Sequence, residues 1–306
     1  MSIGNCTRAA SRTAIIIAYF LVYVVWGSTY FFIGVALEGL PPFLLGAFRF
    51  TAAGLILLAV CRLRGERVWR TGLVRRSAVS GLVLLFVDMA VIMLAQRYVS
   101  SSLVAIVASS TAVWIMLLDV PAWRQTFSNP VAVAGILMGF GGVALLYVEQ
   151  LGSGGSAVHH ERGVLLLVAG CVSWALGTLY TKYRSCGTEA VDGFAGSAWQ
   201  MLSASTAFWV CALLGGDAEQ TDLGEVPRRI WAALLYLVTC GSILAYTAYV
   251  WLLKVRPATE VATHAYVNPV VAVAIGAGVG GEHVTIVQLC GLAVILLSVM
   301  LVSRRR

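Results

Sequence analysis

The chain of 306 residues is 59% apolar and 11% charged, and its mean hydropathy is +0.88. These values lie far outside the range of soluble globular proteins and indicate an integral membrane protein. The net charge of +7 would suit a nucleic-acid partner, but the basic residues gather on one predicted side of the membrane, beside anionic lipid. No nucleic-acid partner is therefore expected.

Apolar runs long enough to cross a hydrocarbon core of about 30 Å as helices recur along the whole chain. The sequence predicts ten transmembrane helices and leaves almost nothing for a soluble domain. They lie near 14–36, 42–61, 76–95, 98–119, 130–148, 163–183, 192–214, 230–252, 257–280 and 285–303. The first run is too long for a cleaved signal peptide and lacks a small-residue cleavage motif, so it is interpreted as a span.

The lysine and arginine positions predict how the spans are oriented. With both termini in the cytoplasm, sixteen basic residues lie inside, while Arg97, Arg162, Arg228 and Arg229 lie outside and Arg49 lies within a span. This excess satisfies the positive-inside rule. We therefore expect a multi-pass membrane protein with both termini cytoplasmic.

Motifs of soluble enzymes are missing from the sequence. The seven cysteines are dispersed without a CxxC pair, the four histidines form no HExxH, and no GxSxG motif or phosphate-binding glycine loop occurs. The sequence predicts neither a metal site nor a cofactor, and it does not predict an enzyme.

The two halves of the chain resemble each other. Trp26 and Tyr30 in the first span correspond to Trp174 and Tyr180 in the sixth. GAFRFTAAG in the second span resembles GSAWQMLSA in the seventh, and the deep polar residues of these segments are Arg49 and Gln200. SSLVAIVASSTAV in the fourth span matches ATEVATHAYVNPV in the ninth at a constant offset of 157. Such self-similarity indicates an internal repeat.

The repeat predicts two five-helix halves, 1–148 and 163–306, joined by an external Gly/Ser-rich linker, 149–162. Because each half has an odd number of spans, the second half enters the membrane from the opposite side. The fold class is therefore an all-α integral membrane protein with ten transmembrane helices as two inverted repeats. Inverted repeats are typical of secondary transporters, whose substrate lies near the midplane of the bilayer.

Two longer stretches resemble a known family. YVNPVVAVAIGAGVGGE, 266–282, followed by GLAVILLSVMLV, and the earlier VWGSTYFFIGVALEGLPPFLLGAFRFTAAGLILL resemble the EamA family of the drug/metabolite transporter superfamily. The resemblance covers roughly 14–303 and implies a permease of the bacterial inner membrane, similar to exporters of amino acids and other small metabolites. The first half departs from the pattern, with Ala112 where the repeat suggests a proline like Pro269, and VPAWRQ where the second half has GGE.

Two charges lie deep in the predicted spans. At about 1.5 Å per residue, Arg49 lies about 12 Å below the outer face on the second span, and Asp88 on the third stops about 10 Å short of that face. We expect the two side chains to meet. They would form either a structural ion pair, or a gate or contact to a substrate carboxylate.

A polar stripe marks the ninth span. Glu260, His264 and Asn268 are spaced by four and share one helix face, while Pro269 breaks the helix by leaving the Ala265 carbonyl without a donor. We expect Asn268 and His264 to contact the substrate, and His264 with Glu260 to carry any coupled proton. In the alternative, Glu260 lies at the headgroups, His264 bonds a neighbouring helix and Pro269 serves packing.

Paired aromatic residues also reach the membrane interior. At about 1.5 Å per residue, Trp26, Trp174 and Asn268 lie about 16–18 Å from the membrane face at which their spans begin. This depth is too great for residues of an interfacial aromatic belt. We expect Trp26, Tyr30, Trp174 and Tyr180, with Gln200, to line a substrate cavity suited to a solute with an apolar part. Core packing or contact with lipid is the alternative for each aromatic residue.

The sequence as a whole predicts a secondary transporter of small organic metabolites that works by alternating access. Its partners are the solute and the lipid bilayer, and coupling to protons and the oligomeric state are left open. One alternative is a membrane-embedded enzyme such as an aspartyl protease, which would need two aspartates at one depth, whereas Asp119 ends a helix and Asp217 starts an outer loop. A membrane scaffold that does not transport is the other.

Overall fold

The computed structural model describes residues 11–152, 157–184, 194–256, 261 and 263–303. Within these ranges the chain forms helices and their connections, without strands. Eight helical stretches are long and apolar enough to cross a membrane: Arg12–Leu37, Pro42–Leu63, Thr71–Ala95, Ser101–Leu118, Pro130–Glu149, Arg162–Tyr180, Phe194–Leu214 and Arg228–Leu252. Two shorter apolar helices, Val267–Gly278 and Ile286–Leu301, lie where the last two spans are predicted. The all-helical membrane fold is confirmed, and the count of ten spans stays a prediction.

The first half of the chain contains several helices joined without a break. Its elements are α1 (Arg12–Phe20), η1 (Leu21–Val25), α2 (Trp26–Leu37), α3 (Pro42–Leu63), α4 (Thr71–Gly81), η2 (Leu82–Val87), α5 (Asp88–Ala95), α6 (Ser101–Ala108), α7 (Thr111–Leu118), η3 (Val120–Ala122), α8 (Trp123–Phe127) and α9 (Pro130–Gly152). Proline opens α3, where its missing N–H needs no partner, and Gly65 follows its end with a φ of 75°.

The second half follows the same order of long helices. Its elements are α10 (Ala157–Arg184), α11 (Phe194–Leu214), α12 (Asp217–Gln220), α13 (Arg228–Tyr236), η4 (Leu237–Ala245), α14 (Tyr246–Val255), α16 (His264–Gly278) and α17 (Ile286–Ser303). The segments η1, η2 and η4 are π-helical turns inserted into otherwise α-helical spans.

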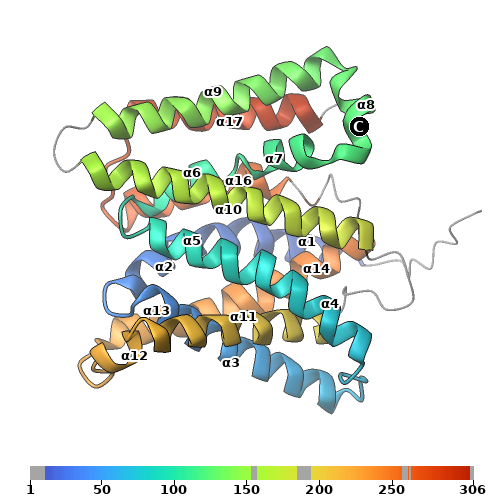
Figure 1. Cartoon of the computed structure of the whole chain (residues 1–306), viewed down its shortest axis with the longest axis vertical. Helices are drawn as coiled ribbons and strands as arrows, with labels where there is room; N and C mark the ends of the chain where they lie inside the picture. The colour runs from blue at the N-terminus through green and yellow to red at the C-terminus, as the bar shows by residue number, and fades with distance from the viewer. Residues whose placement is uncertain (1–10, 153–156, 185–193, 257–260, 262, 304–306) are drawn as a thin grey trace, which may run out of the picture.

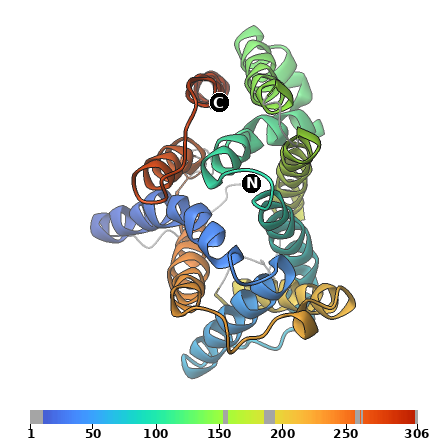
Figure 2. The same cartoon turned by 90° about the vertical axis from the view of Figure 1, so that its left-hand side faces the viewer.

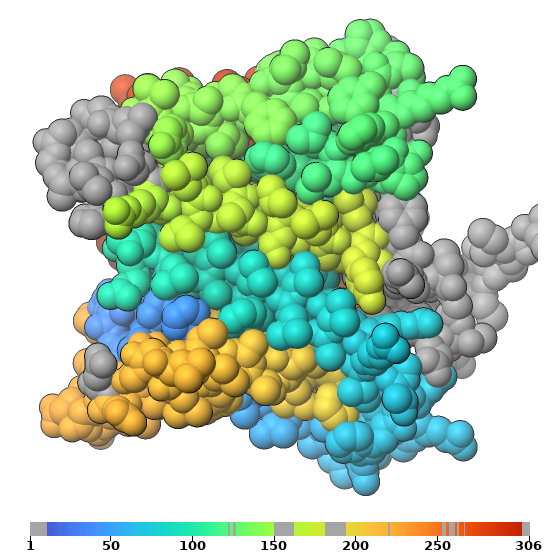
Figure 3. Space-filling model, viewed as in Figure 1, coloured from blue at the N-terminus to red at the C-terminus, as the bar shows by residue number. Residues whose placement is uncertain are grey.

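Helices that correspond in the two halves pack against each other. The pairs α3 with α11, α9 with α17, and α6 with α16 are in direct contact, and the members of the first two pairs run in opposite directions (Figure 1). The pair α9–α17 lies at one end of the longest axis of the molecule and the pair α3–α11 at the other (Figures 1 and 2). On the face in Figure 3, side chains of α10, of α4 with α5, and of α11 lie against one another as successive bands.

Small residues allow this close packing. A Cβ atom added to Gly46 on α3 would lie 2.5 Å from the Phe208 ring of α11, and one on Gly142 of α9 would lie 2.7 Å from Ile295 of α17. Phe208 also stacks on Phe50, with ring centroids 5.7 Å apart. Close helix approach through glycine is common in membranes, where van der Waals contact drives association.

The connections gather at two ends of the bundle. We call the end that carries α12 and the α2–α3 and α5–α6 connections the outer end, because the charge bias predicts that it faces away from the cytoplasm. The start of α1, the end of α17 and the α3–α4 turn all lie at the opposite end of the bundle (Figure 1).

Candidate functional site

Five ring-bearing side chains from four helices meet inside the bundle. This aromatic cluster is centred on Trp26, whose ring centroid lies 6.0 Å from Trp174, 6.4 Å from Tyr246, 5.2 Å from Tyr249 and 5.4 Å from His264. These separations are those of favourable aromatic pairs. The cluster draws on α2 from the first half and on α10, α14 and α16 from the second, so it lies where the two halves meet.

Sequence reasoning found three of these five residues. It named Trp26, Trp174 and His264, and the structure brings them together. It missed Tyr246 and Tyr249, although their spacing of three places both on one helix face. The repeat comparison did not include the eighth span, which carries them.

A hydrogen bond to the segment just before α16 orients the His264 ring. Its Nδ1 lies 2.9 Å from the carbonyl oxygen of Val261, and since a carbonyl only accepts, Nδ1 carries the proton. In the neutral ring Nε2 is then the basic nitrogen, available to accept a hydrogen bond or a proton.

Gln200 connects the cluster to the other half of the chain. Its Nε2 donates to Ser80 Oγ on α4 at 2.9 Å, and the Tyr246 hydroxyl donates to its Oε1 at 2.7 Å. Gln200 is 4% exposed. The amide therefore holds one edge of the aromatic cluster in position, and its contact with substrate stays a prediction.

Asn268 holds two helices together. With its amide nitrogen turned towards η1, it donates to the carbonyl oxygens of Tyr23 at 2.9 Å and Val22 at 3.0 Å. Gly27 permits the approach, because an added Cβ there would lie 3.0 Å from the Asn268 carbonyl oxygen. The predicted substrate contact is untested, and the structure gives this amide a use in helix packing.

Helix α16 continues through Pro269 from His264 to Gly278. The proline is its sixth residue and cannot donate the hydrogen bond that the Ala265 carbonyl would accept, and the predicted loosening of the helix there stays a prediction. The fourth span, which has Ala112 at the corresponding position, is instead interrupted at Ser109–Ser110 between α6 and α7.

Three other predicted residues are placed as follows. Tyr30 is half-buried one turn after Trp26 on α2, and its carbonyl oxygen accepts from Gln96 Nε2 at 3.0 Å. Tyr180 lies on α10 six residues beyond Trp174, and no ring contact joins it to the aromatic cluster within the described chain. Glu260 lies outside the described residues.

Arg49 and Asp88 do not form the expected ion pair. Both are buried, but no ion pair of either is found among the described residues. The Arg49 Nε donates to Ser242 Oγ on η4 at 2.9 Å, and Nη1 points at the Met89 sulfur, 4.0 Å away. The depth estimate was compatible with a pair, but depth does not fix which way a side chain faces around its helix.

Each π-helical turn adjoins a residue of this region. Trp26 directly follows η1, Asp88 directly follows η2, and η4 contains Ser242 and is followed by Tyr246. A π turn leaves backbone carbonyls without their usual donors and is frequent at functional sites. Two carbonyl oxygens of η1, those of Val22 and Tyr23, accept from the Asn268 amide.

At the outer end a carboxylate joins the two halves. Glu282, of the GGE motif, accepts from the backbone N–H groups of Ser101 at 3.2 Å and Ser102 at 3.0 Å, and from both hydroxyls at 2.5 Å. A negative charge there is stabilised by these two N–H groups and by the dipole at the start of α6. The contact joins the segment that follows α16 to the start of α6.

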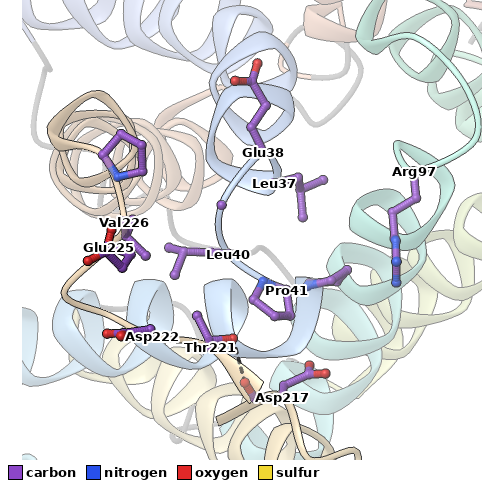
Figure 4. Close-up of a pocket in the computed structure, with 13 residues that line it drawn as sticks. Leu37, Glu38, Leu40, Pro41, Arg97, Asp217, Thr221, Asp222, Glu225 and Val226 are labelled. Carbon is purple, nitrogen blue, oxygen red and sulfur yellow. Dashed lines mark hydrogen bonds between the residues drawn. The ribbon is translucent and has the colours of Figure 1, made fainter. Parts of the chain in front are cut away.

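A pocket of about 650 Å³ also opens at the outer end, between the α2–α3 connection, Arg97 and the segment from Asp217 to Pro227 (Figure 4). The Thr221 hydroxyl donates to the Asp217 carbonyl at 2.6 Å. Burial raises the pKa of the Asp217 carboxyl, and the charge of Arg97 partly opposes this. Within the described ranges, no three acidic, histidine or cysteine side chains gather as metal ligands would.

Comparisons with known proteins agree over nearly the whole chain. The model of the EamA-like transporter family matches residues 13–148 and 161–304. The uncharacterized inner membrane transporter YedA of Escherichia coli K12 is 32% identical over 295 residues, which cover 94% of this chain and 89% of that protein. A probable amino-acid metabolite efflux pump of Salmonella typhimurium is 27% identical over 280 residues, 90% of each chain.

A solved crystal structure has the same fold. It superposes with a TM-score of 0.64 at 21% sequence identity, covering 96% of this chain and 100% of the other. At this level of identity the likeness concerns the fold alone.

Proposed function

Since this chain belongs to the EamA-like transporter family, we propose that it exports a small organic metabolite, an amino acid or a related amphipathic compound, by alternating access. The observation that carries the proposal is the aromatic cluster, which is built from both halves of the chain. A site between two halves can be exposed to either side when one half rocks against the other.

The residues of this region have distinct proposed roles. Trp26, Trp174 and the two tyrosines of α14 form the wall against which the apolar part of the solute packs. His264 Nε2 accepts a hydrogen bond from the solute, and His264 with Glu260 carries a proton if transport is coupled to one.

The remaining predicted residues complete the path. Gln200 fixes the position of Tyr246 and lies beside the solute, while Tyr30 and Tyr180 line the path on the outer and inner sides of the aromatic cluster. Asn268 keeps α16 against η1 and so positions His264, one turn before it. With both termini cytoplasmic in the inner membrane, Glu282 closes the outer side when the site faces inward.

Flux measurements test this function. Liposomes that contain the purified protein are loaded with each of a panel of labelled amino acids and related metabolites. Efflux is compared with that from loaded liposomes without the protein. We expect Trp26→Ala to lower the kcat/KM of the best solute by about tenfold or more, because an aromatic contact surface is lost. Trp69→Ala, which removes a 66% exposed ring on the α3–α4 connection, is the matched control. Flux by Trp26→Ala equal to that of the unmodified protein would remove the aromatic cluster from the solute path.

A further inference from the structure

Two opposite charges are buried without a charged partner among the described residues. Arg49 is 3% exposed and Asp88 is 7% exposed. Neither has an ion pair within 4.0 Å among the residues that the structure describes. A charge inside a membrane protein persists where it pairs or faces a cavity or solute, because its desolvation is expensive.

The Arg49 guanidinium uses little of its donor capacity. Its Nε donates to Ser242, its Nη1 has only the weak thioether acceptor of Met89, and the group lies over the Phe50 ring at 5.1 Å. Its Nη2 lies beside Gly241, where an added Cβ would be 3.3 Å from that nitrogen. Hence the two terminal nitrogens have no oxygen acceptor in the described chain, and this fork is the geometry that binds a carboxylate.

The Asp88 carboxylate is likewise without a donor. Its Oδ1 would lie 3.4 Å from a Cβ added to Gly170 on α10, and no hydrogen bond to it is found among the described residues. The absence of a side chain at Gly170 lets α10 approach α5 closely beside the carboxylate, because an added Cβ would also lie 3.1 Å from Val91.

Both charges lie close to helices that carry the aromatic cluster. The Cβ position of Gly241, 3.3 Å from Arg49 Nη2, also lies 2.9 Å from Thr29 on α2, three residues after Trp26. Gly170, beside Asp88, precedes Trp174 on α10 by one helical turn. An anion binder and a cation binder therefore each adjoin a helix that contributes to the apolar wall.

We propose that Arg49 and Asp88 together select a zwitterion, with the solute carboxylate on Arg49, its ammonium on Asp88 and its apolar side chain against the aromatic cluster. This inference rests on the proposed transport function. A solute with a single charge would leave one buried protein charge unpaired, so it would be rejected, whereas a zwitterion satisfies both.

Matched sets of solutes test the inference. In liposomes holding purified protein, efflux is measured for L-leucine with 3-methylbutan-1-amine and 4-methylpentanoate, and for L-phenylalanine with 2-phenylethylamine and 3-phenylpropanoate. For at least one of the two sets, kcat/KM of the unmodified protein should be about tenfold or more higher for the amino acid than for the corresponding amine or acid. The amine lacks the contact of the carboxylate, and the acid lacks that of the ammonium group.

The two charge-removing variants should fail in different ways. Arg49→Gln should lose the preference for the amino acid over the amine and keep its preference over the acid. Asp88→Asn should do the reverse, and the exposed control Arg229→Gln should keep both preferences. Because these are ratios within one variant, a partial loss of folded protein leaves them unchanged. Melting temperatures of solute-free protein give a second measurement: without an ion pair, the effects of Arg49→Gln and Asp88→Asn should add in the double variant.

Two outcomes overturn the inference and leave the transport function standing. One is equal flux of amino acid, amine and acid through the unmodified protein. The other is a non-additive change in melting temperature. In that case each single variant melts at a lower temperature than the unmodified protein and the double variant regains part of the loss, as expected of an ion pair. Flux of none of these compounds or of the wider panel would reject the transport proposal as well.

Discussion

The contact between Glu282 and the start of α6 gives the sharpest prediction about stability. Glu282→Gln replaces a carboxylate that accepts four hydrogen bonds from Ser101 and Ser102, two of them from backbone N–H groups. The amide keeps one acceptor oxygen, and its NH₂ group faces donors of α6. One pair of donors therefore loses its partner, and the helix dipole loses a compensating charge.

The expected loss follows from these four bonds. Hydrogen bonds to a charged group contribute about 1.5–3 kcal/mol each, and loss of the charge at a helix start adds about 0.3–1 kcal/mol. Neighbouring bonds are not additive, and water reaches the outer end, so we expect a destabilisation of about 2–4 kcal/mol. At about 2 °C per kcal/mol for a chain of this size, the melting temperature should fall by roughly 4–8 °C.

Thermal unfolding of the purified protein in one detergent measures this effect. Glu225→Gln, which neutralises an exposed carboxylate on the outer loop, is the matched control and should leave the melting temperature unchanged. Glu282→Gln should also show a coupling of about 0.5–3 kcal/mol with the double replacement of Ser101 and Ser102 by alanine. Equal melting temperatures for Glu282→Gln and Glu225→Gln, or full additivity with the serine replacements, would refute the reasoning.

Four further predictions concern packing, coupling and orientation. Gly27→Ala should destabilise the protein by about 1–3 kcal/mol, because the added Cβ would lie 2.9 Å from Val271. Gly141→Ala adds a Cβ with no atom within 4 Å and should leave the stability unchanged, so equal melting temperatures of the two variants would contradict the prediction. Asn268→Ala should lower the melting temperature by removing two bonds to η1, and an unchanged melt with weakened solute affinity would instead make Asn268 a substrate contact. His264→Gln should flatten the dependence of flux on pH between about 5 and 8, and an unchanged profile would exclude it as a proton carrier. A cysteine at Ser153 should be labelled from outside the cell, and labelling from the cytoplasmic side alone would reverse the predicted orientation.

Much of the architecture was predictable because it depends on local composition. A membrane helix must be apolar over its whole length and satisfies its own backbone hydrogen bonds, so each span is marked in the sequence without knowledge of its neighbours. The doubling of the chain was visible for a similar reason, since matching motifs such as those around Trp26 and Trp174 need only be compared in sequence. Both tryptophans were predicted to line one site, and they are in contact.

The tertiary structure alone decided which polar groups meet. Residue counting placed Arg49 and Asp88 at similar depths, but the direction in which each side chain faces depends on helix rotation and on neighbours, and Arg49 bonds Ser242 instead. Glu282 finds its partners 181 and 180 residues away in the other half, a contact that no local pattern encodes.

The aromatic cluster shows the same division. Depth and pairing indicated Trp26 and Trp174, yet Tyr246 and Tyr249 join them only because α14 packs against η1 and presents that face inward. The π-helical turns before Trp26 and Tyr246 change the direction in which the following residues face, and Asn268 of α16 bonds two carbonyls of η1. The chemistry of each side chain is therefore written in the sequence, whereas its partner depends on the rotation and register of helices that only packing sets.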